Sequence, residues 1–341
     1  MNSIAQMQAD ERAQLFAETA DRKAISDAIV EKDFWVCWIL KQLFSIDALS
    51  GRLLFKGGTS LSKVFHAINR FSEDIDLAVD YAALGFIGSR DPRQETLSKT
   101  KRATILAEMM TVCQQYIGGE FLDALKARCE ELLGTTDTWS LDVSEHDRNV
   151  VRFRYPTAVA KGLAYVAPQV ILELGTHAEF VPHGRFTIRS FAAEEFPQVV
   201  ADGDVAVEAL LAKRTFWEKA TILHAEYYRP EERVLPDRYS RHYYDLAMLA
   251  QTPIRAEALS DMALLAQVVR HKETFYPSGW ARYDLAHPGS LRLLPTEQRL
   301  TVLERDYRNM GVMIFGEPPG FDDIMATLEQ LEQEMNRSDG V

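Results

Sequence analysis

The spacing of apolar residues predicts helices toward both ends of the chain. Between residues 20 and 48 apolar side chains recur at helical spacing, which predicts one or two packing helices with Asp27 and Glu31 on their more polar positions. From Val205 onward the pattern is helical again, interrupted by a polar, proline-containing loop at 229–240. The stretch EPPGFDDIMATLEQLEQEMNRSDGV predicts a final helix and a frayed end. Four aromatic residues at helical positions are predicted to lie in the core: Trp35, Trp38, Phe216 and Trp217.

The middle of the chain carries strand patterns. The stretch LLFKGGTSLSKVFHAINRFSEDIDLAVD, residues 53–80, predicts a short strand, a tight turn at Gly57-Gly58, a helix that includes Val64 and Ile68, and a second strand. Residues 82–98 predict a loop, and 99–133 an amphipathic helical insertion. The stretches RNVVRFRYP and APQVILELGTHAEF return to strand character. The predicted class is therefore α+β.

The length and composition limit the class of protein. At 341 residues the chain exceeds the ~250–300 that usually share one core, so two lobes are expected. A net charge of −12 excludes a protein that coats nucleic acid nonspecifically, but leaves a local RNA site open. The sequence shows no secretory signal and no membrane span, and we expect a cytoplasmic protein. The cysteines form no C-x-x-C pair and are expected to be buried or idle: Cys37, Cys113 and Cys129.

Candidate chemistry gathers in residues 53–80. Glycines after a strand let backbone N–H groups approach an anion, and Thr59 and Ser60 add hydroxyl donors. Asp74 and Asp76, two apart on a strand, face the same side, and two adjacent carboxylates suit Mg²⁺. The plain alternative is a glycine turn followed by a solvated acidic strand. The ordered combination favours a nucleotide site.

Several other site types lack their motifs. KGGTSLSK has the wrong spacing for a P-loop, and G-x-G-x-x-G is absent. No H-E-x-x-H zinc pair and no G-x-S-x-G serine elbow occurs.

Four ordered motifs resemble one family. FKGGTSLSK…RFSEDIDL, IVEKDFW, RTFWEKATILHAE and RHYYDLAML are similar to the AbiEii/AbiGii toxins of type IV toxin–antitoxin systems, which include the mycobacterial MenT toxins. That family belongs to the DNA polymerase β-like nucleotidyltransferase superfamily. The resemblance implies a mixed sheet with flanking helices plus a C-terminal helical domain. It implies helices at 1–50, a catalytic domain at 51–200 and a helical domain at 205–341 that completes the nucleotide site.

The resemblance also assigns roles to residues. It implies that Asp74 and Asp76 bind Mg²⁺ and that Lys219 places an ammonium on the triphosphate. The alternative for Lys219 is a solvated helix face. The resemblance places the NTP-binding turn on Gly57, Gly58, Thr59 and Ser60. Either the Thr59 or the Ser60 hydroxyl could contact the phosphate.

The fourth motif departs from the family pattern. The family reads Arg-Asp-x-x-Asp where this chain has Arg241-His242-Tyr243-Tyr244-Asp245, so His242 replaces the first aspartate. Arg241 is assigned to the nucleotide and Asp245 to the base and ribose or the catalytic centre. The alternative is an i,i+4 ion pair between them. Glu173 is the candidate third carboxylate, with an edge position that faces water as the alternative. Lys56 is a candidate phosphate contact, and the alternative is that it caps the strand end.

The acceptor is suggested by the resemblance alone. It implies RNA, with tRNA acceptor ends as the leading candidate, or a protein hydroxyl, and a cognate AbiEi-like antitoxin as partner. Basic groups that suit RNA phosphates occur at two places: Lys99, Lys101 and Arg102, and Arg148, Arg152 and Arg154. The main hypothesis is an Mg²⁺-dependent nucleotidyltransferase toxin that moves a nucleoside monophosphate from NTP to RNA. The alternatives are a nucleotide-binding regulatory module and a phosphotransferase.

Overall fold

The chain forms two compact units that are not contiguous in sequence. The computed structural model describes residues 1–72, 74–135, 137–159 and 167–337. The first unit comprises Met1–Val64 and Ser72–Leu210, and the second comprises Phe65–Phe71 and Leu211–Val341. The backbone therefore passes between the units three times. Within the described residues, no helix combines the length and the apolar character needed to cross a membrane.

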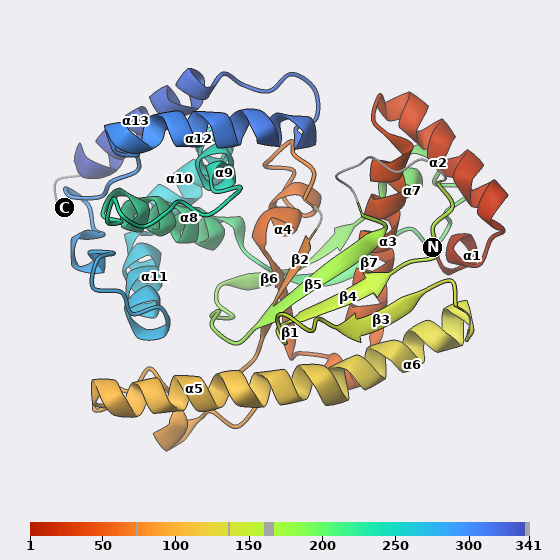
Figure 1. The fold of residues 1–341 in the computed structure, drawn as a ribbon, viewed down its shortest axis with the longest axis horizontal. Helices are drawn as coiled ribbons and strands as arrows, with labels where there is room; N and C mark the ends of the chain where they lie inside the picture. Colours follow the sequence, from red (N-terminus) through yellow and green to blue (C-terminus); the bar gives the residue numbers. More distant parts are fainter. Residues whose placement is uncertain (73, 136, 160–166, 338–341) are drawn as a thin grey trace. The chain divides into compact units, whose positions relative to one another are not determined.

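The first unit is built on a seven-stranded mixed sheet, which confirms the predicted α+β class (Figure 1). Its strands are β1 (Leu53–Lys56), β2 (Asp74–Val79), β3 (Ser140–Val143), β4 (Val150–Arg154), β5 (Gln169–Gly175), β6 (His183–Ile188) and β7 (Val205–Leu210). They lie in the order β3-β4-β5-β2-β1-β7-β6. The pairs β1–β7 and β2–β5 are parallel, and the other four pairs are antiparallel.

The prediction of helix from Val205 onward is wrong for Val205–Leu210, which forms strand β7. This strand pairs with β6 along its whole length, from Ile188 opposite Val205 to His183 opposite Leu210. Val205 and Val207 are buried while Ala206 between them is exposed, which is the alternation of a strand with one face on a core. A run of six mostly apolar residues is too short for periodicity to separate strand from helix. Pairing with β6 makes this segment a strand.

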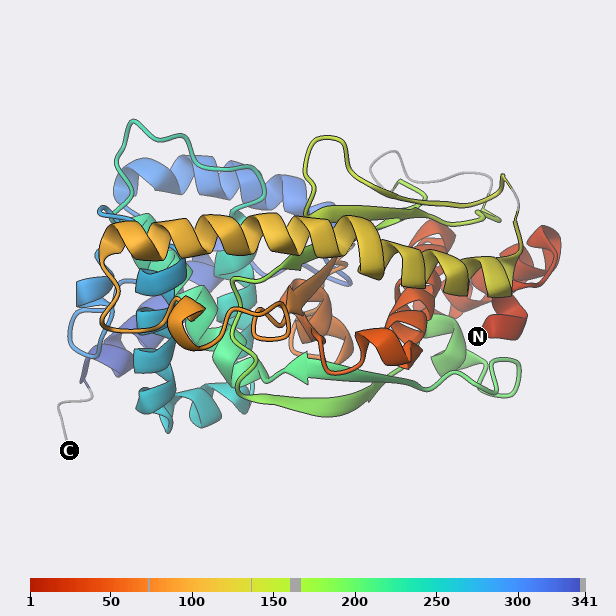
Figure 2. The ribbon, with the colours of Figure 1, turned by 90° about the horizontal axis from the view of Figure 1, so that it is seen from below.

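Helices flank the sheet. They are α1 (Asn2–Ala5), α2 (Ala9–Lys23), α3 (Asp27–Ser45), α4 (Gly57–Lys63), α5 (Lys99–Tyr116), α6 (Leu122–Leu133) and α7 (Phe191–Glu195). Figure 2 shows α5 and α6 as one long rod. A π-helical segment, Ile117–Phe121, joins them, and its Gly119 leaves helical geometry at φ −119° and ψ −106°. The rod is kinked at this segment, because the π-helical turn and Gly119 interrupt the α-helical backbone.

Helix α3 is the centre of the first unit. Ser26 caps its N-terminus, and the Ser26 side chain accepts a hydrogen bond from the N–H of Ala28. Every residue from Ala28 to Leu40 is buried, so α3 is enclosed on all sides. Trp35 and Trp38 lie in the core, as predicted, and so do the three cysteines. Glu31 was predicted on a polar position, and this is wrong: it is only 2% exposed.

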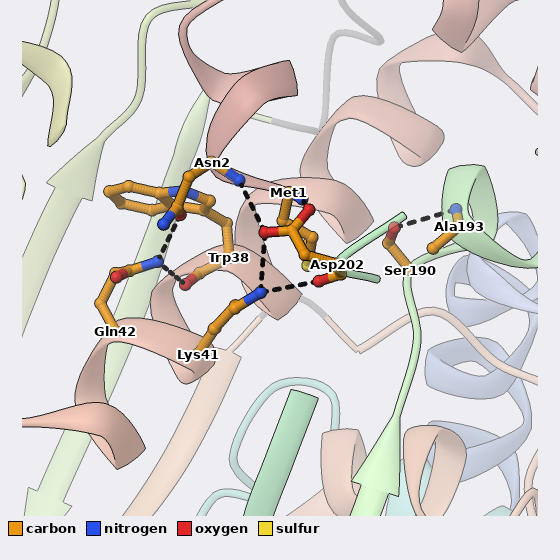
Figure 3. Close-up of polar contacts among 8 residues, drawn as sticks. All are labelled: Met1, Asn2, Trp38, Lys41, Gln42, Ser190, Ala193 and Asp202. Atoms are coloured by element: carbon orange, nitrogen blue, oxygen red, sulfur yellow. Dashed lines mark hydrogen bonds and ion pairs between the residues drawn. The ribbon is translucent and has the colours of Figure 1, made fainter. Parts of the chain in front are cut away.

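Polar side chains fasten the start of the chain to α3, as Figure 3 shows. The indole N–H of Trp38 donates to Asn2 Oδ1 at 3.0 Å, and Gln42 Nε2 donates to the same oxygen at 3.1 Å. Lys41 Nζ lies 2.9 Å from Asp202 Oδ2, and the Met1 ammonium also pairs with Asp202. These contacts tie the first turn of the chain to the segment that precedes β7.

The second unit is helical, as predicted for the C-terminal region. Its α-helices are α8 (Ala212–Tyr227), α9 (Ser240–Ala250), α10 (Ile254–Leu259), α11 (Met262–Phe275), α12 (Glu297–Met310) and α13 (Phe321–Arg337). Helix α9 packs against α8, α12 and α13. Phe216 and Trp217 of α8 are fully buried, which confirms their predicted core positions.

The segment that follows α4 differs from its prediction. The helix was expected to include Val64 and Ile68, but it ends at Lys63. Residues 65–71 instead join the second unit, where Arg70 forms an isolated bridge with Ile314. The apolar residues of segment 65–71 belong to the second unit and not to the unit that contains α4. Helical spacing alone does not show in which unit an apolar residue is buried.

Candidate active site

Asp74 and Asp76 lie on one face of β2. Ile75 and Leu77, the residues that alternate with them, are fully buried on the opposite face, while both aspartates are half-buried. Two carboxylates thus project together from the centre of the sheet, as strand geometry requires. Lys56 is the register partner of Asp76 on β1, so its side chain shares that face.

Gly57 is in close contact with the second aspartate. Its φ is +78°, a left-handed conformation that favours glycine. A Cβ at this position would lie 1.8 Å from Asp76 Oδ2 and 2.6 Å from Asp76 Cγ. The carboxylate therefore occupies the space that any side chain at position 57 would need. The turn and the acidic strand meet at this point of the fold.

The two hydroxyls after the glycines have different surroundings. Thr59 Oγ1 donates to the main-chain carbonyl oxygens of Asp74 and of Ser72, the latter at 3.3 Å. It thereby holds α4 against the start of β2. Ser60 is buried, but its hydroxyl forms no hydrogen bond within the residues that the structure describes. Of the two hydroxyls left open by the sequence, Ser60 is the one not used to hold the fold.

Glu173 stands beside Asp76. The two residues are register partners on the parallel strands β2 and β5, so their side chains project from the same face. Glu173 is exposed. Among the described residues, no three His, Cys, Asp or Glu side chains lie close enough together to hold a metal ion. Asp74 and Asp76 suit Mg²⁺, which is commonly held by one or two carboxylates, with phosphates and waters as its other ligands.

In the second unit, Asp245 lies between two cations. Arg70 donates to both of its oxygens, with Nε–Oδ1 at 2.7 Å and Nη2–Oδ2 at 2.9 Å, and Lys219 Nζ lies 2.7 Å from Oδ2. Asp245 is fully buried. Burial alone would raise the pKa of this carboxyl, but Arg70 and Lys219 hold it well below its usual range. The alternative of an i,i+4 ion pair with Arg241 is not the arrangement found.

Lys219 is buried rather than solvated. Burial lowers the pKa of its ammonium, although Asp245 opposes this shift. Its Nζ lies 3.5 Å from Nδ1 of His242, the residue that replaces the family's first aspartate. Burial and the Lys219 charge lower the pKa of His242 well below its usual value, so the imidazole is neutral near pH 7. Position 242 thus carries a neutral group beside the ammonium.

The sequence analysis missed Arg70. It lies in the quoted stretch RFSEDIDL, four residues before Asp74, and its partner is 175 residues away. The available signal was a lone cation between two apolar segments. That pattern does not predict that Arg70 would pair with Asp245.

A buried ion pair that the sequence did not predict supports α4. Lys63, the last residue of α4, pairs with Asp33 of α3, and the two side chains are 7% and 3% exposed. Asp33 Oδ2 also accepts the N–H of Phe191 at 2.7 Å. Lys63 Nζ donates to the carbonyl oxygen of Arg189 at 3.1 Å. These contacts fix the helix that begins at Gly57 to α3 and to the start of α7.

Of the first basic group, Arg102 has a structural role. Its guanidinium donates to the carbonyl oxygens of Pro92 at 2.9 Å and Gln94 at 3.0 Å, which fastens the preceding loop to α5. Lys99 and Lys101 are exposed at the start of the same helix.

Comparison with known proteins gives one family. The profile of the family described as nucleotidyl transferase AbiEii toxin, type IV toxin–antitoxin system, matches residues 38–327. No curated protein sequence shows a significant match. Among solved structures, the chain is similar to MenT4, a nucleotidyltransferase toxin from Mycobacterium tuberculosis H37Rv. That match has a TM-score of 0.50 and 16% identity, and covers 96% of this chain and 90% of the other. At this identity the likeness supports the fold.

Proposed function

Because the chain belongs to the AbiEii nucleotidyltransferase toxin family of type IV toxin–antitoxin systems, we propose that it transfers a nucleoside monophosphate from an NTP to RNA, with Mg²⁺ as cofactor. The proposed acceptor is tRNA. An acceptor hydroxyl oxygen forms the new bond to the α-phosphorus. The bond between that phosphorus and the β-phosphate oxygen breaks, pyrophosphate leaves with the electron pair, and the hydroxyl proton passes to solvent.

The contact between Gly57 and Asp76 is the observation that supports this proposal best. It brings the turn that would receive the triphosphate against a carboxylate that would hold the metal. Asp74 on the same face would be the second ligand. Glu173 on β5 is the candidate third, and its side chain would have to turn toward the aspartates to reach a shared ion. Bound Mg²⁺ would lower the pKa of the attacking hydroxyl and neutralise charge on the departing pyrophosphate.

The remaining residues of the turn would bind the donor. Ser60 has a hydroxyl available for a phosphate oxygen, and Lys56 projects on the same face as Asp76. Thr59 would act indirectly, through its hydrogen bonds to the start of β2. We also propose a cognate AbiEi-like antitoxin as the partner, since type IV systems pair a toxin with an antitoxin.

The proposal is tested by incubating the protein with each α-labelled NTP, Mg²⁺ and total tRNA. Asp76→Ala should lower the rate by on the order of 10³-fold or more, because it removes a metal ligand. Glu208→Gln is the matched control, since Glu208 is a half-buried carboxylate on β7 of the same sheet. Its rate should stay near that of the unmodified protein. No labelled RNA with any of the four nucleotides would contradict the proposal.

The same assay separates the alternatives. Label from γ-labelled but not α-labelled NTP would indicate phosphoryl transfer. Tight NTP binding without any product, unchanged by Asp76→Ala, would indicate a regulatory module.

A further inference from the structure

The sheet face that carries the aspartates continues across β5 onto β4. Asp74 is the register partner of Ile171, and Ile171 is the register partner of Arg152. Register partners on neighbouring strands project from the same face, so these three side chains form one row. Strands lie ~4.8 Å apart, which places the Cα atoms of Asp74 and Arg152 about two spacings, or ~10 Å, from each other. Only the side chain of Ile171 stands between them in the row.

Arg152 has no partner in the described part of the chain. It is half-buried, yet it forms no hydrogen bond and no ion pair with any described residue. Its register partner on β3, Asp142, contacts a different arginine: Arg154 Nη1 lies 3.8 Å from Asp142 Oδ2 and 3.4 Å from Ser140 Oγ. A partly desolvated guanidinium without an acceptor is unfavourable unless a ligand supplies one. Arg152 is therefore available to an anion.

The strand order assigns that anion to the acceptor rather than to the donor nucleotide. The turn at Gly57 follows β1, which flanks β2 on one side, whereas β5 and then β4 flank β2 on the other. A triphosphate on the turn would therefore approach the aspartates from the β1 side. Arg152 lies on the opposite side of them. A second anionic substrate that meets the donor over Asp74 would come from the β4 side.

We propose that Arg152 binds a backbone phosphate of the RNA acceptor and so aligns its reactive hydroxyl over the aspartates. The inference rests on the proposed function. A guanidinium offers a planar fork of donors that matches phosphate oxygens, and it stays charged at any physiological pH. One charge-assisted contact of this kind is typically worth ~1.5–3 kcal/mol, or roughly 10- to 100-fold in affinity.

The test compares Arg152→Gln with a matched control, Arg185→Gln. Arg185 lies on β6, at the other edge of the sheet, is exposed, and likewise has no ion pair with a described residue. Both variants remove one positive charge, so any effect of net charge alone is common to them. Arg152→Lys is included because it keeps the charge and loses the fork.

We expect Arg152→Gln to raise the KM for tRNA at least tenfold, with the KM for NTP changed less than twofold. Arg152→Lys should recover part of this loss. The salt dependence of tRNA binding should become shallower by about one unit of slope, since one phosphate contact is lost. Arg185→Gln should leave both KM values unchanged.

A raised KM for NTP, an unchanged KM for tRNA, or an equal effect of Arg185→Gln would overturn the inference. Direct binding of fluorescently labelled tRNA in the presence of NTP and Ca²⁺ is measured for all variants. If no variant or unmodified protein turns over RNA, the proposed function fails, and this binding series still decides the role of Arg152. Equal tRNA binding by unmodified protein and Arg152→Gln would then refute it.

Discussion

The buried pair of Asp33 and Lys63 provides the most direct test of how α4 is held in place. Asp33→Asn removes one charge and leaves the Lys63 ammonium in a site where it is 7% exposed. Burial alone would lower the pKa of Lys63, but the Asp33 carboxylate outweighs this and raises it. Removing one partner of a buried pair typically destabilises by ~3–5 kcal/mol, because the other charge is left without compensation. We expect Asp33→Asn to fall within that range.

The double variant Asp33→Asn/Lys63→Met separates pairing from packing. If the loss in Asp33→Asn arises from an isolated charge, the second substitution should recover at least ~1 kcal/mol, since a neutral pair needs no compensation. The assay is urea unfolding followed by circular dichroism, with the free energies compared in a double-mutant cycle. A loss below ~1 kcal/mol in Asp33→Asn, or strict additivity of the two single changes, would refute the reasoning.

Three further predictions concern the glycine turn at 57–60 and the buried Asp245. Gly57→Ala should lower the transfer rate by ~10²-fold in a single-turnover assay, because its Cβ displaces the Asp76 carboxylate by an ångström or more. Asp245→Asn should lower the free energy of unfolding by ~3–5 kcal/mol near neutral pH. The pKa of Asp245 is lowered by folding, so in urea titrations this difference should be full above about pH 4 and shrink as the pH falls below it. Ser60→Ala should raise the KM for NTP with little effect on unfolding, whereas Thr59→Val should destabilise the protein by ~1 kcal/mol; the reverse pattern would show that the hydroxyls have been assigned wrongly.

Local patterns predicted the central elements of the first unit well. The order of strand, glycines, helix and acidic strand depends on residues within about thirty positions, and periodicity reports such short-range order directly. The pairing of β2 with β5 was not predictable in this way, because it joins segments almost a hundred residues apart. The position of Glu173 beside Asp76 therefore depended on register that only the fold supplies.

Buried charged side chains were the feature that the sequence predicted least well. Glu31 was predicted on one of the more polar positions of its helix, yet its two oxygens accept hydrogen bonds from Thr157 Oγ1 at 2.8 Å and the N–H of Ala158 at 2.6 Å. A charged residue in a helix reads as solvent-facing unless its partner is known, and the partner lies 126 residues away. The same distance problem hid Arg70, whose partner Asp245 lies 175 residues away.

The path of residues 65–71 has a consequence for any attempt to divide this protein. A truncation after Leu210 would delete the rest of the unit to which this heptapeptide belongs, and with it the carboxylate that Arg70 binds. Residues 65–71 would remain inside the truncated product without their partners, and only two residues separate this segment from Asp74, the first metal-binding candidate. An autonomous catalytic fragment is thus better sought by bridging 64 to 72 with a short linker than by shortening the C-terminus alone.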